Sequence, residues 1–282
     1  MDRADLKLLF LDLDGTLLDD EKEISPGNRR ALERALSAGH GVVITTGRAL
    51  SSARIQARRL GLDKPGCFVI AFNGAAIYDC GAEQVIYALP LDMDAFSAVV
   101  DECNRRGVFL QTYEGEDVVV EPQNDNDVVR RYCAISRMHG HRVVGDLRRD
   151  LHEPPFKALM IDYEVRRPLE EMEMWIRDNL SGRIDCFFSN SSYLEVVHAG
   201  LNKGRAVVEL CGRLNVPVSN AIAVGDEAND LSMIQAAGIG VAMANGTDGV
   251  KAAADYVTER DNNHDGVAEV VERFCFGASG SI

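Results

Sequence analysis

Residues 6–18 read Leu-Lys-Leu-Leu-Phe-Leu-Asp-Leu-Asp-Gly-Thr-Leu-Leu, an apolar run that leads into two aspartates and a glycine. The run, interrupted only by Lys7, is typical of a strand buried on both faces of a parallel sheet. Asp12 and Asp14 follow at its carboxyl end, where open α/β sheets place their active sites. Side chains two residues apart in an extended chain point the same way, roughly 6.6 Å apart. A small electrophile therefore fits between the two carboxylates.

Composition limits the partners and the location of the protein. The chain has 282 residues, 46% of them apolar, which is enough for a substantial core and two domains. Its formal net charge of −14 argues against nucleic acid as a partner. No apolar stretch reaches the ~20 residues that a membrane span requires. Seven cysteines without a Cys-x-x-Cys pair, and an N-terminus without a signal peptide, predict a cytoplasmic protein with reduced thiols.

Strands and helices alternate at both ends of the chain, whereas the middle has another pattern. Apolar runs at 41–46 and 67–71 are separated by amphipathic helical segments, as in parallel crossovers. The same alternation resumes at Lys203. Between these parts, closely spaced strands with helices near 92–106 and 167–180 favour an antiparallel sheet with helices on one face.

The prediction is therefore an α/β protein in which a Rossmann-like parallel sheet core carries an inserted α+β domain. The core is expected to comprise residues 1–83 and 199–282, and the insert residues 84–198. A hairpin that turns near Gly81 leads into the insert. The stretch 122–150 is polar and rich in arginine, and no helix or strand is assigned to it.

Three further polar motifs stand where a strand gives way to a helix, or at a helix start. They are Thr45-Thr46-Gly47-Arg48, Asn202-Lys203-Gly204 and Gly225-Asp226-Glu227-Ala228-Asn229-Asp230. Each alone has an ordinary explanation: a turn, a solvated lysine, or carboxylates in the first turn of a helix. Together they bring carboxylates, a hydroxyl, an ammonium and free amides to one edge of one sheet. Magnesium prefers one or two carboxylates plus phosphate and water, and phosphate prefers lysine, hydroxyl and amide donors. The set predicts phosphoryl transfer.

In this order the motifs resemble those of the haloacid dehalogenase superfamily of phosphatases, and the position of the insert resembles its Cof-type branch. The resemblance covers nearly the whole chain, including Asn73-Gly74 and Asp265-Gly266-Val267. It implies a Mg²⁺-dependent phosphoric monoester hydrolase that acts on small phosphorylated metabolites, sugar phosphates above all. The expected partner is such a metabolite, with neither nucleic acid nor a membrane, and the expected assembly is a monomer or weak homodimer.

The resemblance also assigns roles to the core residues. Asp12 is the implied nucleophile, which forms an aspartyl-phosphate, and Asp14 the general acid and then base. A carboxylate beside a cation stays ionised, whereas a carboxyl crowded by like charge can hold a proton, which supports this division. The implied metal ligands are Asp12, Asp14 through its backbone carbonyl, Asp226 and Asp230. The implied phosphate-binding residues are Thr46, Gly47, Lys203 and Asn229. Glu227 departs from the family, in which many relatives carry glycine or serine.

The insert resembles a mobile cap, which would exclude water and complete the substrate contacts. Its hinges are expected near Gly81 and Gly200, where glycine can absorb backbone change. Substrate specificity is expected from side chains that face Asp14. The candidates are Arg48, Asn73, Tyr113, Glu114, Arg130, Arg131, Ser189 and Tyr193.

Two alternatives share the same core. A phosphomutase or phosphotransferase would use a second alcohol in place of water. A non-catalytic sensor of phosphate ligands predicts the loss of at least one of four residues, all of which are present: Asp12, Asp14, Lys203 and Asp226. Dehalogenases of the superfamily need no acid at position 14, so Asp14 argues against that reaction.

Overall fold

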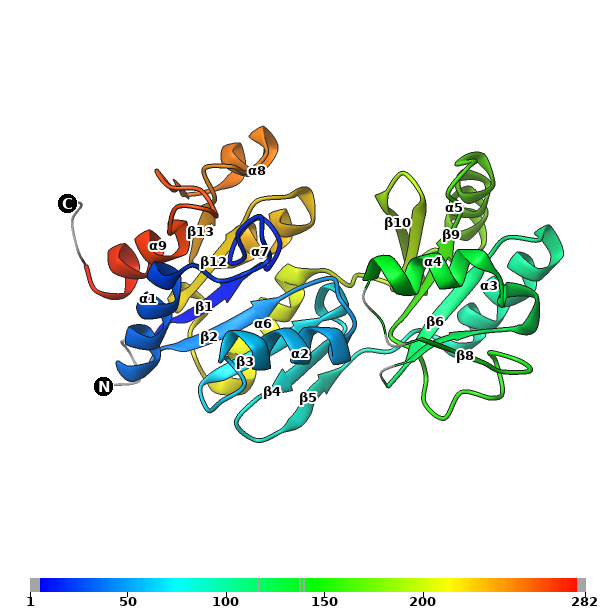
Figure 1. Cartoon of the computed structure of the whole chain (residues 1–282), viewed down its shortest axis with the longest axis horizontal. Coiled ribbons are helices and arrows are strands. Elements are labelled where there is room, and N and C mark those ends of the chain that lie inside the picture. The colour runs from blue at the N-terminus through cyan, green and yellow to red at the C-terminus, as the bar shows by residue number, and fades with distance from the viewer. Residues whose placement is uncertain (1–5, 116, 137, 139, 278–282) are drawn as a thin grey trace. The chain divides into compact units, whose positions relative to one another are not determined.

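The computed structural model describes residues 6–115, 117–136, 138 and 140–277. The chain divides into two compact units, one formed by Met1–Tyr87 with Asn202–Ile282 and the other by Ala88–Leu201 (Figure 1). The first unit contains a largely parallel sheet between helices, and the second contains a mostly antiparallel sheet with helices. The predicted α/β class, with an α+β insert in the chain of the core, is confirmed.

The first unit is built on an eight-stranded sheet in the order β14-β13-β12-β1-β2-β3-β4-β5. Its strands are β1 (Leu8–Leu11), β2 (Gly41–Thr45), β3 (Cys67–Ala71), β4 (Ala76–Asp79), β5 (Gln84–Ala88), β12 (Ala221–Gly225), β13 (Ile239–Ala242) and β14 (Tyr256–Val257). The strands from β14 to β3 run parallel, and β4 pairs antiparallel with β3. Every residue of β1, β2 and β12 is buried, as expected for central strands of a covered parallel sheet.

Helices of the first unit cover this sheet. They are α1 (Pro26–Ser37), α2 (Leu50–Leu60), α6 (Lys203–Leu214), α7 (Leu231–Ala236), α8 (Asp248–Ala253) and α9 (Gly266–Cys275). In Figure 1, α2 lies in front of the sheet and α6 behind it. Their ends follow the expected local rules: Ser25 caps α1 by accepting a hydrogen bond from the Asn28 amide, and α2 ends at Gly61 in the left-handed region.

The second unit is built on a six-stranded sheet in the order β10-β11-β9-β6-β7-β8, in which the β7–β8 pair alone is parallel. Its elements are α3 (Met93–Arg106), β6 (Leu110–Glu114), β7 (Asp117–Val120), α4 (Asp127–Ser136), β8 (His141–Val143), β9 (Lys157–Ile161), α5 (Arg167–Leu180), β10 (Ile184–Asn190) and β11 (Tyr193–His198). Side chains of α3 and α5 form one apolar core with one face of this sheet, which includes Phe96, Met160 and Met172.

Two features differ from the prediction. β5 belongs to the sheet of the first unit. The boundaries between the units along the chain therefore fall after Tyr87 and before Asn202, whereas the prediction placed them after residue 83 and before residue 199. The hairpin near Gly81 is a turn inside that sheet, because pairing with β4 holds β5 there. The stretch 122–150 contains α4 and β8; in α4 the apolar residues are interrupted by Arg130 and Arg131, and only Val129, Tyr132 and Cys133 are buried.

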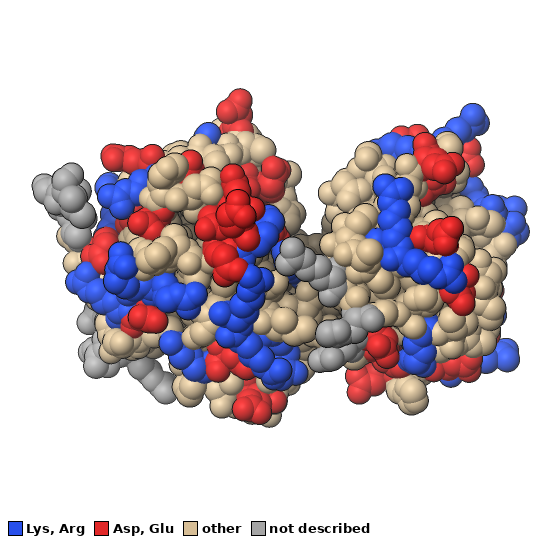
Figure 2. Space-filling view, viewed as in Figure 1, with Lys and Arg blue, Asp and Glu red and all other residues tan. Residues whose placement is uncertain are grey.

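The surface has mixed charge. On the face shown in Figure 2, acidic and basic side chains are interspersed over each unit. None of the described helices combines the length and the apolar character that crossing a membrane requires.

Candidate active site

Asp12 and Asp226 stand just beyond the carboxyl ends of β1 and β12, which are neighbours in the sheet. The chain runs from β1 to β2 and β3 on one side, and from β12 to β13 and β14 on the other. The direction in which successive strands are added to the sheet therefore reverses between β1 and β12. Such a reversal opens a crevice at the carboxyl ends of the strands, where ligands of α/β sheets bind. The Asp12 amide donates to the Val224 carbonyl at 3.1 Å, which fixes the two ends beside each other.

Lys203 joins the acidic residues of the first and fourth motifs. It is the first residue of α6, after the N-cap Asn202, and its side chain is completely buried. Its ammonium donates to an oxygen of Asp12 and to one of Asp230, both at 2.6 Å. Asp12, Asp226 and Asp230 offer carboxylate oxygens that all lie within 4.8 Å of one another. The first, third and fourth motifs thus contribute side chains to one buried cluster.

The carboxylates of this cluster differ in how fully they are engaged. Asp230 uses one oxygen for Lys203 and the other for the backbone amides of Asp226 and Glu227, at 3.0 and 3.1 Å. Asp226 accepts from the Thr16 hydroxyl at 2.7 Å through Oδ1. No described residue donates a hydrogen bond to Oδ2 of Asp12 or of Asp226. Asp230 therefore orients the loop and the lysine, while Asp12 and Asp226 each keep an oxygen for a ligand.

Gly15 makes room for this arrangement. Its φ of +81° lies in the left-handed region, which glycine adopts without strain. A Cβ atom at this position would lie 2.3 Å from Oδ2 of Asp226. The glycine of Asp-x-Asp-Gly is therefore required both by its backbone and by the approach of Asp226.

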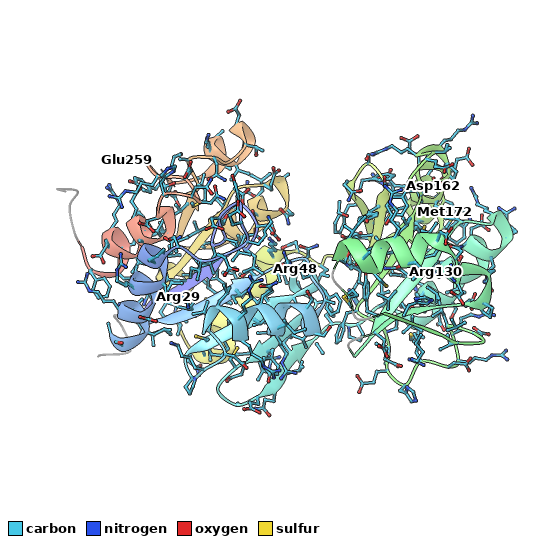
Figure 3. The ribbon with its side chains drawn as sticks, viewed as in Figure 1. Arg29, Arg48, Arg130, Asp162, Met172 and Glu259 are labelled. Atoms are coloured by element: carbon cyan, nitrogen blue, oxygen red, sulfur yellow. The ribbon has the colours of Figure 1, made fainter. Side chains whose placement is uncertain are left out.

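Asp14 lies outside the buried cluster, with its side chain 44% exposed. One guanidinium nitrogen of Arg48, a residue marked in Figure 3, contacts both of its oxygens, at 3.0 and 2.8 Å. The Lys22 ammonium lies 3.0 Å from Oδ1. The first motif is thus joined to the second by an ion pair.

The second motif also approaches the loop after β3. Thr46 is buried, and its hydroxyl accepts a hydrogen bond from the Arg48 amide at 3.2 Å. Asn73 has a left-handed backbone with φ of 57°, and its amide donates to the Thr46 carbonyl at 3.0 Å. A Cβ on Gly47 would lie 3.0 Å from Oδ1 of Asn73, an oxygen that is buried and accepts no hydrogen bond from the described residues.

The pKa values of the two motif aspartates are opposite to the sequence-based expectation. Burial raises the pKa of Asp12 to about 7, although the Lys203 ammonium opposes the shift. The pKa of Asp14 is lowered: partial burial would raise it, but Arg48 and Lys22 together outweigh that effect. The sequence led us to expect that neighbouring carboxylates would keep a proton on Asp14. Among the groups of the protein itself this is wrong, because the two cations Arg48 and Lys22 contact Asp14. Burial likewise raises the pKa of Asp226 to about 6, against a hydrogen bond from Thr16.

Residues 9–271 match the family model of the haloacid dehalogenase-like hydrolases. The chain belongs to this family. It is 32% identical, over 96% of both chains, to the 5-amino-6-(5-phospho-D-ribitylamino)uracil phosphatase YcsE of Bacillus subtilis. It also resembles the crystal structure of a haloacid dehalogenase-like hydrolase from Bacteroides thetaiotaomicron, with a TM-score of 0.85 and 33% identity over 95% of this chain and 99% of that one.

A second solved structure is that of the subclass IIB sugar phosphatase BT4131, with a TM-score of 0.75 and 26% identity over 95% of this chain and 98% of that one. These comparisons confirm the predicted family. The protein is a phosphoric monoester hydrolase of the haloacid dehalogenase type that acts on small phosphorylated molecules.

Other predicted residues of this phosphatase lie elsewhere. Asn229 is exposed in the 3₁₀ turn Ala228–Asp230, whereas its neighbour Asp230 is buried and contacts Lys203. Glu227 is exposed and caps that turn together with Asp230. The departure from the family at position 227 thus has a local structural role.

The candidates in the second unit have varied surroundings. Tyr113 is buried and hydrogen-bonded to the Tyr132 hydroxyl at 2.6 Å, and the Tyr193 hydroxyl lies 3.1 Å from that of Tyr163. Ser189 is exposed in β10. Charged candidates are paired: Glu114 with Arg142, Arg130 with Asp125, and Arg131 with the Tyr163 ring.

Sequence reasoning gave no role to three residues of the phosphatase site. Thr16, the donor to Asp226, stands in the first motif directly after Gly15. Lys22, beside Asp14, and Asn245, which donates to the Gly15 carbonyl at 2.7 Å, follow no recognisable pattern. Lys22 and Asn245 reach the site only through the folding of the chain.

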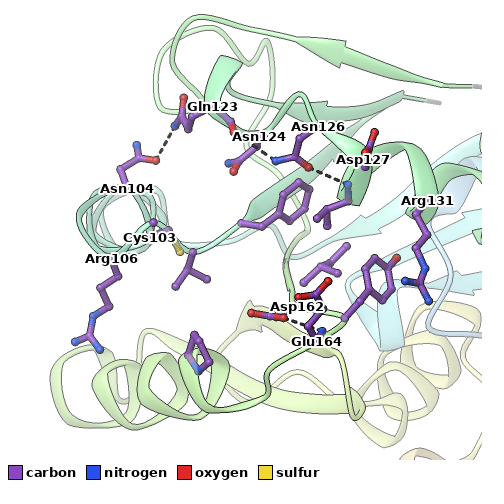
Figure 4. A pocket seen from close by; sticks show the side chains of 17 residues that line it. Cys103, Asn104, Arg106, Gln123, Asn124, Asn126, Asp127, Arg131, Asp162 and Glu164 are labelled. Carbon is purple, nitrogen blue, oxygen red and sulfur yellow. Dashed lines mark hydrogen bonds between the residues drawn. The ribbon is translucent and has the colours of Figure 1, made fainter.

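A separate cavity of about 560 Å³ lies wholly within the second unit (Figure 4). It opens between the end of α3, the start of α4 and the loop after β9, and Phe109, Ile161 and Tyr163 contribute apolar walls. Arg131 is the one candidate residue in its lining. The cavity contains no residue of the acidic cluster.

Proposed function

We propose that this phosphatase is Mg²⁺-dependent and hydrolyses small phosphorylated metabolites, sugar phosphates above all, through an aspartyl-phosphate on Asp12. The observation that carries the proposal is the buried contact of Lys203 with Asp12 at 2.6 Å, beside Asp226 at the reversal point of the sheet. One phosphate group could then contact all three side chains. Asp12 would be the nucleophile, Lys203 would bind the phosphoryl oxygens, and Asp226 would bind a metal.

The buried cluster fits a magnesium ion. Three buried carboxylates face a single ammonium, and such an excess of buried negative charge is unfavourable without a further cation. Carboxylate oxygens are the ligands that Mg²⁺ prefers. Oδ2 of Asp12 and Oδ2 of Asp226 are the atoms best placed to hold it. Asp230 fixes their surroundings through its hydrogen bonds with Lys203 and with the backbone amide of Asp226. The ion would neutralise phosphate charge and orient the substrate.

The residues of the other motifs would bind the phosphoryl group. Lys203 can extend its contact from Asp12 to a phosphoryl oxygen. The Thr46 hydroxyl accepts from the Arg48 amide and so keeps its own hydrogen for an anion. Gly47 follows in the turn between β2 and α2, at the carboxyl end of the sheet.

In the first step, an oxygen of Asp12 attacks phosphorus, the bond to the leaving alcohol breaks, and that alcohol takes a proton from Asp14. In the second step, a water oxygen attacks the aspartyl-phosphate, its proton passes to Asp14, and inorganic phosphate leaves as Asp12 is restored. Pairing with Arg48 and Lys22 favours the ionised form of Asp14, which is the form that the second step requires.

The second unit is proposed to act as the cap that selects the substrate. The α/β core carries all residues of the acidic cluster, so the inserted unit is the part of the chain that remains for recognising the organic group. The sugar phosphatase BT4131 and YcsE, whose substrate carries a phosphorylated ribityl chain by its name, support a polyhydroxylated leaving group.

The test is a screen of sugar phosphates, nucleotides and other phosphorylated metabolites for release of inorganic phosphate in the presence of Mg²⁺. Asp12→Asn should abolish the release while circular dichroism and the melting temperature stay near wild type. Asp248→Asn, a change at an exposed carboxylate of the same unit, is the matched control and should keep full activity. Wild-type turnover by Asp12→Asn would contradict the assignment of the nucleophile.

A further inference from the structure

The backbone of Arg48 is held at both ends. Its amide donates to the Thr46 hydroxyl at 3.2 Å, and its carbonyl accepts from the Phe72 amide at 2.9 Å. Both partners lie just beyond strand ends that border the site, Thr46 after β2 and Phe72 after β3. The point from which the Arg48 side chain starts is therefore fixed relative to the acidic cluster.

The side chain of Arg48 ends on Asp14. Its Nη2 lies 3.0 Å from Oδ1 and 2.8 Å from Oδ2 of Asp14, and the guanidinium side chain is only 31% exposed. Asp14 itself is 44% exposed and directly precedes Gly15, whose φ is +81°. An aspartate in such a place has several accessible rotamers, and a contact to both oxygens restricts it to one.

Lys22 is the second cation on this carboxylate, at 3.0 Å from Oδ1. It reaches a single oxygen from a turn in which its own φ is 63°, and its side chain is 46% exposed. Among the described residues, these two cations are the groups that contact the Asp14 carboxylate. Arg48, which contacts both oxygens from an anchored backbone, is the stronger restraint.

We propose that Arg48 is the positioning residue that holds the Asp14 carboxylate for the second chemical step, the hydrolysis of the aspartyl-phosphate. In that step the water oxygen bonds to phosphorus, the phosphorus–oxygen bond to Asp12 breaks with its electron pair returning to Asp12, and the water proton passes to Asp14. Arg48 takes no proton and acts only through its contact with the Asp14 carboxylate. The inference rests on the proposed function, because it requires the aspartyl-phosphate and the base role of Asp14.

The role differs from the substrate contact that the sequence suggested for Arg48. A substrate contact would strengthen the binding of phosphate in every step. A positioning role instead affects the step in which Asp14 must accept a proton, so its loss leaves phosphorylated enzyme to accumulate. This difference between the two roles is measurable.

The experiment uses p-nitrophenyl phosphate with the full chain and Mg²⁺, because its phenolate leaves without needing a proton. Arg48→Gln should release about one nitrophenolate per active site in a burst, followed by a steady state slowed about 100-fold, within the range of general base effects. The value of kcat should fall with little change in kcat/KM, and rapid-quench mass spectrometry should find the phosphoryl group on Asp12. A fall in kcat and kcat/KM together, without a burst, would overturn the positioning role.

Two further variants separate this inference from the proposed function. Asp14→Asn should give the same burst; a burst with Asp14→Asn but none with Arg48→Gln overturns the role of Arg48 alone. Absence of a burst with Asp14→Asn overturns both. Should Arg48→Gln fail to fold, Arg48→Lys keeps the charge without the planar guanidinium and should show a smaller slowing of the second step. Arg58→Gln, which breaks the exposed pair of Arg58 with Asp63 at the end of α2, is the control and should behave as wild type.

Discussion

The ammonium of Lys203 lies 2.6 Å from a carboxylate oxygen of Asp12, although 191 residues separate the two in the chain. Burial lowers the pKa of Lys203, but the charges of Asp12 and Asp230 more than compensate and raise it overall. The lysine is thus a permanent cation inside the protein. Its position is a consequence of the fold, because the inserted unit leaves and rejoins the core between these two residues.

Lys203→Met should destabilise the protein as well as inactivate it. The change leaves two buried carboxylates without their shared cation, and breaking a buried ion pair costs about 3–5 kcal/mol in the free energy of unfolding. The measurement is urea unfolding in the presence of a chelator. Lys251→Met, on α8, is the control, and an equal loss in both variants would contradict the prediction.

Gly15→Ala should impair activity more than an ordinary strained substitution does. A left-handed backbone conformation costs a non-glycine residue about 1–2 kcal/mol, and here the added Cβ would also lie 2.3 Å from Oδ2 of Asp226. Gly182→Ala has nearly the same φ, +80°, but nothing within 4 Å of the new atom. The two variants are compared by melting temperature and phosphate release. Retention of wild-type activity by Gly15→Ala would show that Asp226 can move without consequence.

Magnesium should stabilise the protein more as the pH rises from 5 to 8. The pKa values of Asp12 and Asp226 are raised to about 7 and about 6, against about 3.8 in the unfolded chain. Without a divalent cation, their contribution to stability is present below about pH 4 and is lost as the pH rises through these folded values. Metal binding requires the ionised forms, so it releases protons.

This pH dependence can be measured as the increase in melting temperature on adding Mg²⁺, at each pH, relative to a chelator. Asp226→Asn, which removes one titrating ligand, should flatten the dependence. An increase that is largest at pH 5 would contradict the prediction.

A chelator should stop phosphate release, and added Mg²⁺ should restore it. Calcium should restore less, because it takes more ligands at longer distances than a compact carboxylate pair provides. The measurement is the initial rate after dialysis against each ion. Full activity in the presence of the chelator would exclude the proposed role of the metal.

In the second unit, Lys157 and Glu195 form a buried ion pair at 3.3 Å, with side chains only 6% and 10% exposed. Lys157→Met alone should lower the free energy of unfolding by about 3–5 kcal/mol, whereas adding Glu195→Gln should recover much of the loss. The exposed pair of Arg213 with Glu209 is the control, and its removal should change stability by less than about 1 kcal/mol. Equal losses for the single and double variants would contradict a direct interaction.

Much of the core could be predicted from local patterns. The run Leu8–Leu11 predicts a central strand because both of its faces are apolar, and the structure buries all four residues. Parallel strands present their carboxyl ends at one edge, so motifs that follow β1, β2 and β12 had to lie near each other. Element ends marked by Ser25 and Gly61 were also predictable, since capping depends on the residue itself.

Other features depended on contacts that no local pattern records. The position of β5 was decided by pairing with β4, and α4 was hidden because two arginines interrupt its apolar residues and only three of its residues are buried. The same is true of the site. Arg48 stands in a recognisable motif, but its contact with Asp14 depends on how the loop after β1 packs against the loop after β2.

The sequence by itself determined which strands are central and which chemical groups gather at their ends, because burial periodicity and residue type are properties of the chain. The tertiary structure alone decided how those groups pair: Lys203 with Asp12 and Asp230, Arg48 with Asp14. Ion pairs and pKa values depend on distances of a few ångströms and on burial, and both arise only when distant segments pack together.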